Sequence, residues 1–220
     1  MEAILLAAGV GSRMGMKTPK QFYTINGKPF FIRSLELFEQ IESIDRVFVT
    51  THADYIGQYQ NHINEFRLTK AELVLGGKTR QESVFNALQK VKSEHVLIHE
   101  AARPLISKEL VFALLEHKEN DGVVPTTPIP FTVAVGADYF ESSLDRAKLH
   151  NIQLPQLFKS EVLKTAHKKA RDENYEATED SMMVHKYGGK VRFIPGLESN
   201  IKITTKLDLI IVNHLLNAKD

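Results

Sequence analysis

Cysteine is absent from the sequence, and this absence excludes several kinds of chemistry. Without cysteine there is no disulfide bond, no thiolate-bound zinc and no cysteine nucleophile. The absence fits a reducing compartment, and we expect a cytoplasmic protein. Long hydrophobic runs are lacking too: the apolar segment 3–8 stops at Gly9 and follows no basic residue, so it is too short for a signal peptide or a membrane span. We interpret it as a buried first strand.

Charge of one sign is not in excess either. Lys and Arg number 28 against 27 Asp and Glu, which leaves a formal net charge of +1. This balance gives no sequence-wide electrostatic footprint for nucleic acid or for an anionic membrane, so we expect neither as a partner. The length of 220 residues, with 43% hydrophobic and 25% charged residues, fits one ordinary globular domain over 1–220. Any anion binding must therefore be local.

Apolar runs of strand length alternate with segments of helical period, which predicts an α/β fold with a mostly parallel sheet covered by helices. The predicted strands are 2–7, 46–51, 72–75, 95–99, 122–125, and 190–194 with 201–204. The predicted helices are 30–42, 54–66, 81–91, 108–118, 160–172 and 206–217. Thr79 and Ser107 stand where the helices after them need caps.

The alternation breaks between Thr126 and Phe158. Prolines interrupt this stretch, and short alternating pieces such as 131–135 replace the longer periods. The stretch is too irregular for another βα unit and too ordered for a linker. We expect a β-arm or lid that leaves the main sheet.

A glycine-containing loop follows the first predicted strand, where an α/β sheet places its ligand crevice. It reads Gly9-Val10-Gly11-Ser12-Arg13, and Lys20 follows Pro19 shortly after. Glycines let backbone N–H groups approach phosphate oxygens closely, although such a turn can also be purely structural. Two cations beside exposed amides suit a triphosphate whose charge must be neutralised during attack.

Three familiar motifs fail on spacing. A dinucleotide-binding fingerprint needs its third glycine where Met14 stands, which disfavours a nicotinamide-dependent oxidoreductase. A Walker loop ending at 77–79 needs an earlier glycine where Glu72 stands. A zincin helix beginning at His99 needs a second histidine where Arg103 stands.

The first loop resembles the Gly-x-Gly-x-Arg-Met and Pro-Lys elements of sugar-nucleotide pyrophosphorylases. Further motifs follow in order at 76–84, 99–104, 145–146 with 154–158, and 200–204. With them, nearly the whole chain resembles the cytidylyltransferase family that includes 2-C-methyl-D-erythritol 4-phosphate cytidylyltransferase and its ribitol-5-phosphate relatives. The resemblance implies a three-layer GT-A-like (Rossmann-like) nucleotidyltransferase fold with a protruding β-arm. It also implies CTP and Mg²⁺ with a polyol-phosphate acceptor, and a homodimer joined by the arm at 126–158.

The resemblance also implies roles for single residues. Arg13 and Lys20 would hold the triphosphate, with Lys20 stabilising charge at the α-phosphorus. Short side chains suit a pyrimidine pocket. The nucleotide would be lined by Ala8, Gly9, Gly77, Arg80 and Ser83.

On the acceptor side, the resemblance implies that Arg146 reaches into the neighbouring subunit to grip the acceptor phosphate. Thr132 would contact the acceptor as well, and Lys202 would neutralise charge near the α-phosphate and the acceptor. Glu100 stands at a position near the metal where the family usually has Asp. Catalysis would consist of positioning and charge neutralisation, because in-line attack by the acceptor phosphate needs no protein nucleophile.

Departures from the family pattern leave the acceptor open. Glu100 replaces the usual Asp, Leu154 replaces the Thr of Thr-Pro-Gln, and the acidic motif reads Thr178-Glu179-Asp180. We favour 2-C-methyl-D-erythritol 4-phosphate, with ribitol 5-phosphate or glycerol phosphate as the alternative. A hypothesis of another class is an inactive nucleotide-binding homologue.

Overall fold

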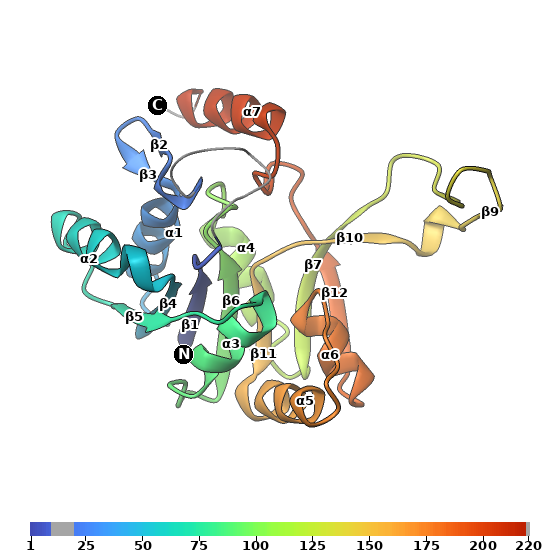
Figure 1. Ribbon diagram of the computed structural model, residues 1–220, viewed down its shortest axis with the longest axis horizontal. Coiled ribbons are helices and arrows are strands. Elements are labelled where there is room, and N and C mark those ends of the chain that lie inside the picture. The colour runs from blue at the N-terminus through green and yellow to red at the C-terminus, as the bar shows by residue number, and fades with distance from the viewer. Residues whose placement is uncertain (10–19, 219–220) are drawn as a thin grey trace.

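One mixed sheet carries the fold, in a computed structural model that describes residues 1–9 and 20–218, with only the backbone of Lys20. Within these residues seven strands follow the order β10-β7-β11-β6-β1-β4-β5, and the eighth strand, β12, pairs with β7 (Figure 1). The strands are β1 (Glu2–Leu6), β4 (Arg46–Thr51), β5 (Ala71–Leu75), β6 (His95–Glu100), β7 (Gly122–Pro128), β10 (His150–Ile152), β11 (Gln156–Lys159) and β12 (Val191–Pro195). Two short pairs lie outside it: β2 (Thr24–Ile25) with β3 (Lys28–Pro29), and β8 (Ala134–Val135) with β9 (Ser142–Ser143).

Helices follow most strands, as the alternation of apolar patterns predicts. They are α1 (Phe30–Glu39), α2 (Ile56–Glu65), α3 (Arg80–Leu88), α4 (Lys108–Leu115), α5 (Ser160–Asp172), α6 (Asp180–Lys186) and α7 (Lys206–Asn217). The side chains of Thr79 and Ser107 accept hydrogen bonds from the backbone N–H groups of Glu82 and Leu110, which confirms both predicted caps. No helix of the described ranges is long and apolar enough to cross a membrane.

Both faces of the sheet are covered, which makes three layers. In β1, Ala3 and Leu5 pack with residues of α1, α2 and α4, whereas Ile4 packs with residues of α3, α5 and α6. Successive side chains of a strand point to opposite faces, so an inner strand covered on both sides is apolar over most of its length. This explains the continuous apolar run at the start of the chain. The arrangement confirms the predicted fold class (Figure 1).

Three details differ from the sequence predictions. Residues 201–204 form no strand, and the N–H of Ile203 instead donates to the carbonyl of Ala102. The strand β11 and the helix α6 were not predicted, because each is short. In addition, β11 lies antiparallel between β6 and β7, so its conformation is decided by long-range pairing.

The predicted arm leaves the sheet, but over a shorter stretch than 126–158. Residues 126–128 still pair with β10, and β11 lies inside the sheet. The part that extends away from the body is therefore about 129–149 (Figure 1). Its large apolar side chains are exposed: Phe131 by 77%, Tyr139 by 85% and Phe140 by 73%.

His99 is a fully buried histidine of β6. Its Nε2–H donates to the carbonyl oxygen of Arg103 at 3.0 Å, and its ring meets the edge of Phe38 with centroids 5.9 Å apart. Burial lowers the pKa of His99 to about 3. The folded protein therefore holds this side chain neutral at pH values where the unfolded chain takes up a proton.

We expect His99 to make the protein less stable on mild acidification. The unfolded pKa is near 6.5 and the folded pKa about 3, so stability is full above the former and falls as the pH drops between the two. From pH 7 to pH 5 this side chain should remove roughly 2 kcal/mol from the free energy of unfolding. Urea unfolding of the wild type and of His99→Gln, which does not titrate, measures the difference. An equal pH dependence in both proteins would contradict the assignment.

Candidate active site

A cleft of about 820 Å³ opens at the carboxyl ends of β1, β4, β5 and β6. Parallel strands bring their carboxyl ends to the same edge of a sheet, so motifs far apart in the sequence meet there. All five residues predicted to bind the nucleotide line this cleft, together with two further predicted residues, Glu100 and Lys202. The five are Ala8, Gly9, Gly77, Arg80 and Ser83.

The turn between β5 and α3 has a fixed shape. The Ser83 hydroxyl donates to the carbonyl of Thr79 at 2.9 Å and accepts from the N–H of Gly77 at 3.0 Å. At Gly76 an added Cβ would lie 2.5 Å from the Cβ of Ala8, so only glycine permits this approach of the two cleft walls. The turn therefore holds backbone groups close to whatever occupies the cleft.

The base of the glycine loop is held from two sides. The carbonyl of Ala7 accepts one hydrogen bond from the amide of Gln21 and one from the hydroxyl of Tyr59, each at 2.6 Å. Tyr59 is buried on α2, and this burial raises its pKa. Gln21 belongs to the 3-10 turn Lys20–Phe22, so the backbone of Lys20 lies next to this anchor. Arg13 lies outside the described residues, as does the side chain of Lys20.

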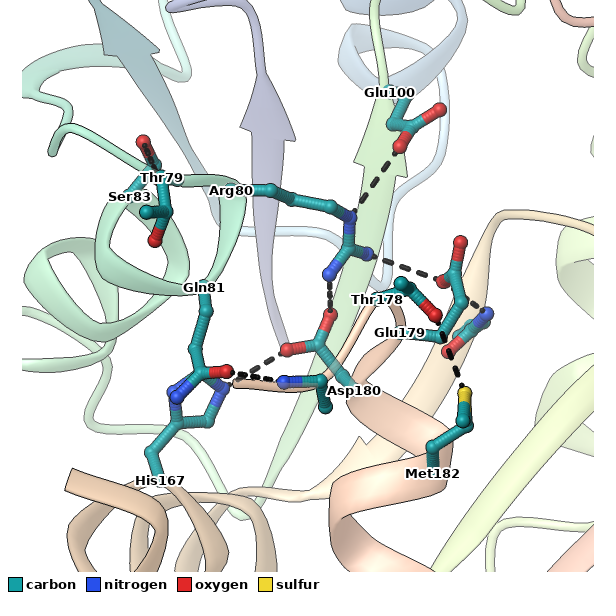
Figure 2. A network of polar contacts seen from close by, with 12 residues as sticks. Thr79, Arg80, Gln81, Ser83, Glu100, His167, Thr178, Glu179, Asp180 and Met182 are labelled. Carbon is teal, nitrogen blue, oxygen red and sulfur yellow. Dashed lines mark hydrogen bonds and ion pairs between the residues drawn. The ribbon is translucent and has the colours of Figure 1, made fainter. Parts of the chain in front are cut away.

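Arg80 lines the cleft and is the centre of a network of charged groups (Figure 2). Its guanidinium lies 2.7 Å from Asp180 and 3.4 Å from both Glu100 and Glu179. Lys202 contacts the second oxygen of Glu100 at 2.7 Å. The network joins α3, β6, the start of α6 and the segment before α7.

The pKa values of the three carboxyls reflect opposing effects. Burial raises the pKa of Glu179, and the attraction of Arg80 offsets this only in part. Burial also opposes the charge of Glu100, but Lys202 and Arg80 outweigh it and lower the pKa of Glu100. Asp180 has a pKa lowered to about 2 despite full burial, because Arg80 and His167 stabilise its charge. Two buried carboxylates are thus ionised at neutral pH.

Two predicted acceptor residues lie elsewhere. Thr132 and Arg146 are exposed on the projecting arm, and Arg146 donates to the carbonyl of Pro130 at 3.1 Å. They do not line the cleft of their own chain. Arg103, which breaks the zincin spacing, donates to the carbonyl of Asn200 at 2.7 Å.

Sequence reasoning missed other members of the network. His167 gave no signal, because a single histidine on an amphipathic helix resembles any other. Gln156, whose amide donates to Glu179 at 3.1 Å, was noted only as part of a motif. Asp180 was noted only as part of the acidic motif; it begins α6 and pairs with Arg80.

The comparisons with known proteins cover the whole described chain. The family model of 2-C-methyl-D-erythritol 4-phosphate cytidylyltransferase (IspD) matches residues 1–218. The chain belongs to this family. The enzyme of that name from Clostridium botulinum is 35% identical over 222 residues, which cover 99% of each chain.

Solved structures agree with the sequence match. The 4-diphosphocytidyl-2C-methyl-D-erythritol synthase of Anaerococcus prevotii superposes with a TM-score of 0.86 at 26% identity, over 98% of this chain and 95% of that one. The 2-C-methyl-D-erythritol 4-phosphate cytidylyltransferase of Thermus thermophilus gives 0.81 at 28% identity, over 99% and 100%. The family predicted from the ordered motifs is confirmed, and with it the nucleotidyltransferase class.

Proposed function

We propose that the protein transfers a cytidylyl group from CTP to the phosphate of 2-C-methyl-D-erythritol 4-phosphate and releases pyrophosphate. The observation that carries the proposal is the family match over residues 1–218. The cleft supports it, because it gathers all five residues expected at the nucleotide with Glu100 and Lys202.

In the proposed reaction an oxygen of the acceptor phosphate attacks the α-phosphorus of CTP. The bond from that phosphorus to the oxygen bridging to the β-phosphorus breaks, and pyrophosphate leaves with the electron pair. Both reactants are anions, so the protein must reduce their repulsion and hold them in line. Arg13 and Lys20 would supply this positive charge, with Lys20 beside the anchored base of the glycine loop, whereas Lys202 already pairs with Glu100 and would mainly hold the reactants in position.

Magnesium is part of the proposal through Glu100. Mg²⁺ in nucleotide sites is held by one or two carboxylates and by the phosphates themselves. Within the described residues no group of three acidic or histidine side chains could hold a metal alone, so the phosphates would have to complete its shell. Glu100 fits as the single carboxylate, since it lies in the cleft and its pKa is lowered by Lys202 and Arg80 against the effect of burial. When bound, the ion would neutralise phosphate charge.

The base would be recognised at Ser83. Its hydroxyl donates to the carbonyl of Thr79 and uses one lone pair to accept from the N–H of Gly77. The second lone pair is left to accept a hydrogen bond from the ligand. Cytosine presents an amino group at its 4-position, whereas uracil presents an oxygen there. The fixed hydroxyl would therefore accept from cytosine and repel uracil.

Ser83→Ala should weaken the preference for CTP over UTP, measured as the ratio of kcat/KM values. Loss of one buried acceptor costs about 1 to 2 kcal/mol of discrimination, which corresponds to roughly tenfold. Ser34→Ala removes a buried hydroxyl of α1 away from the cleft and serves as the control. An unchanged nucleotide preference in Ser83→Ala would remove this residue from base recognition.

The acceptor would be held by a second copy of the chain. Arg146 and Thr132 lie on the arm outside the cleft, and the apolar side chains of the arm are exposed. An extended segment with such side chains buries too little area alone to offset its ordering entropy. We therefore propose a C2 homodimer in which the arm of each chain reaches the other cleft.

Complementation tests this arrangement. Lys20→Ala should lose about 3 to 4 kcal/mol of transition-state stabilisation, and Arg146→Ala should lose acceptor binding. After subunit exchange between the two variants, activity should recover to about a quarter of wild type, because half the dimers are mixed and each holds one intact site. A monomer in sedimentation, or no recovery despite demonstrated exchange, speaks against the dimeric site.

The activity is tested with CTP, Mg²⁺ and a panel of acceptors, with pyrophosphate release as the readout. We expect the fastest release with 2-C-methyl-D-erythritol 4-phosphate, and none with Lys20→Ala. Faster release with ribitol 5-phosphate or glycerol 3-phosphate would change the acceptor. CTP binding without release on any acceptor would identify an inactive nucleotide-binding homologue instead.

A further inference from the structure

His167 joins the Arg80 network through Asp180 (Figure 2). Its imidazole lies on α5 and is 1% exposed. Nε2 lies 2.9 Å from one carboxylate oxygen of Asp180, a residue that is itself completely buried. The residues that line the cleft include Arg80 but neither His167 nor Asp180, so Arg80 connects this pair to the cleft.

The direction of the hydrogen bond follows from the two partners. The ionised carboxylate of Asp180 only accepts hydrogen bonds, so Nε2 of His167 carries a proton and donates it. Nδ1 is buried and has no hydrogen-bond partner among the described residues. The contact with Asp180 is therefore the hydrogen bond that orients this ring.

The contact continues through Asp180 to Arg80. The second oxygen of Asp180 lies 2.7 Å from Nη1 of Arg80, whereas the other two carboxylates lie at 3.4 Å. Asp180 therefore makes the shortest ion pair of the guanidinium. His167 binds the other oxygen and so limits rotation of the Asp180 carboxylate. A carboxylate that cannot rotate holds the guanidinium of Arg80 in one orientation.

We propose that His167 is a positioning residue for nucleotide binding: through Asp180 it fixes the guanidinium of Arg80, which lines the cleft. The expected effect on the KM for CTP rests on the proposed function. Gln81 adds to the arrangement, since its side chain accepts from the N–H of Ala177 and donates to the carbonyl of Tyr175, and so holds the segment leading to Asp180 against α3.

The competing explanation is that His167 only fills space between α5 and its neighbours. Its ring lies near Phe85, with centroids 6.4 Å apart, so a packing role is real. The two explanations differ in one respect. Packing is kept by an apolar side chain of similar size, whereas positioning requires a donor toward Asp180.

Two substitutions of His167 separate the explanations. His167→Leu keeps volume but cannot donate, and His167→Gln can place an amide N–H near the position of Nε2. We expect His167→Leu to raise the KM for CTP about tenfold, a common effect of losing a partner that orients a site residue, with the KM for the acceptor changed less than twofold. His167→Gln should stay within threefold of wild type. Wild-type kinetics in His167→Leu, or equal losses in both variants, would overturn the proposal.

Two controls complete the experiment. Leu163→Val weakens the packing of α5 at another buried position and should leave the KM for CTP unchanged; a matching rise there would assign the effect to packing. Adding His167→Leu to Asp180→Asn should change the KM no further, because both act on one contact, and additive effects would overturn the proposal.

A direct readout keeps the test separate from the proposed function. The Nε–H signal of Arg80 in ¹⁵N NMR should exchange faster with solvent in His167→Leu than in wild type and His167→Gln. Unchanged exchange in His167→Leu refutes the positioning role. Absence of pyrophosphate release in the wild type refutes only the proposed function.

Discussion

The ion pair between Arg80 and Asp180 joins the two parts of the chain on which the site depends. Arg80 begins α3 directly after the glycine turn, and Asp180 begins α6, 100 residues later. The carboxylate of Asp180 is fully buried, and Arg80 is its partner of opposite charge, so removing Arg80 would leave an uncompensated buried charge. The turn that lines the cleft and the helix pair α5–α6 are thereby held in one relative position.

This network constrains how a triphosphate can be bound. Arg80 and Lys202 line the cleft and already face Glu100, Glu179 and Asp180. Their positive charge is largely balanced before any ligand arrives, so they contribute position more than net attraction. Neutralising a triphosphate then requires charge from elsewhere. A metal ion and the cations of the first loop are the sources consistent with the proposed reaction.

The sequence predicted those parts of the fold whose conformation is decided locally or by burial on both faces. Buried parallel strands such as β1 and β4 leave continuous apolar runs, and the caps Thr79 and Ser107 mark where helices begin. β11 was missed because four residues carry little periodicity and its place between β6 and β7 comes from long-range pairing. The ordered motifs located the residues of the cleft, because these motifs lie at strand ends and can be recognised in the sequence by their residue types and spacing. His167 left no pattern, since its role depends on a contact with a residue 13 positions away across two helices.

The acceptor side shows a different limit. Thr132 and Arg146 belong to a recognisable motif order, yet the fold of one chain places them on an arm outside its own cleft. The arm keeps β7 and β10 paired at its base, which fixes its direction, while its tip exposes Phe131, Tyr139 and Phe140. If these side chains are covered by a second chain, as we propose, the association that buries them also completes the acceptor site. Ordering of the arm and binding of the acceptor would then depend on the same interface between the two chains. Weakening the apolar contact would lower the affinity for the acceptor without any change in the cleft itself.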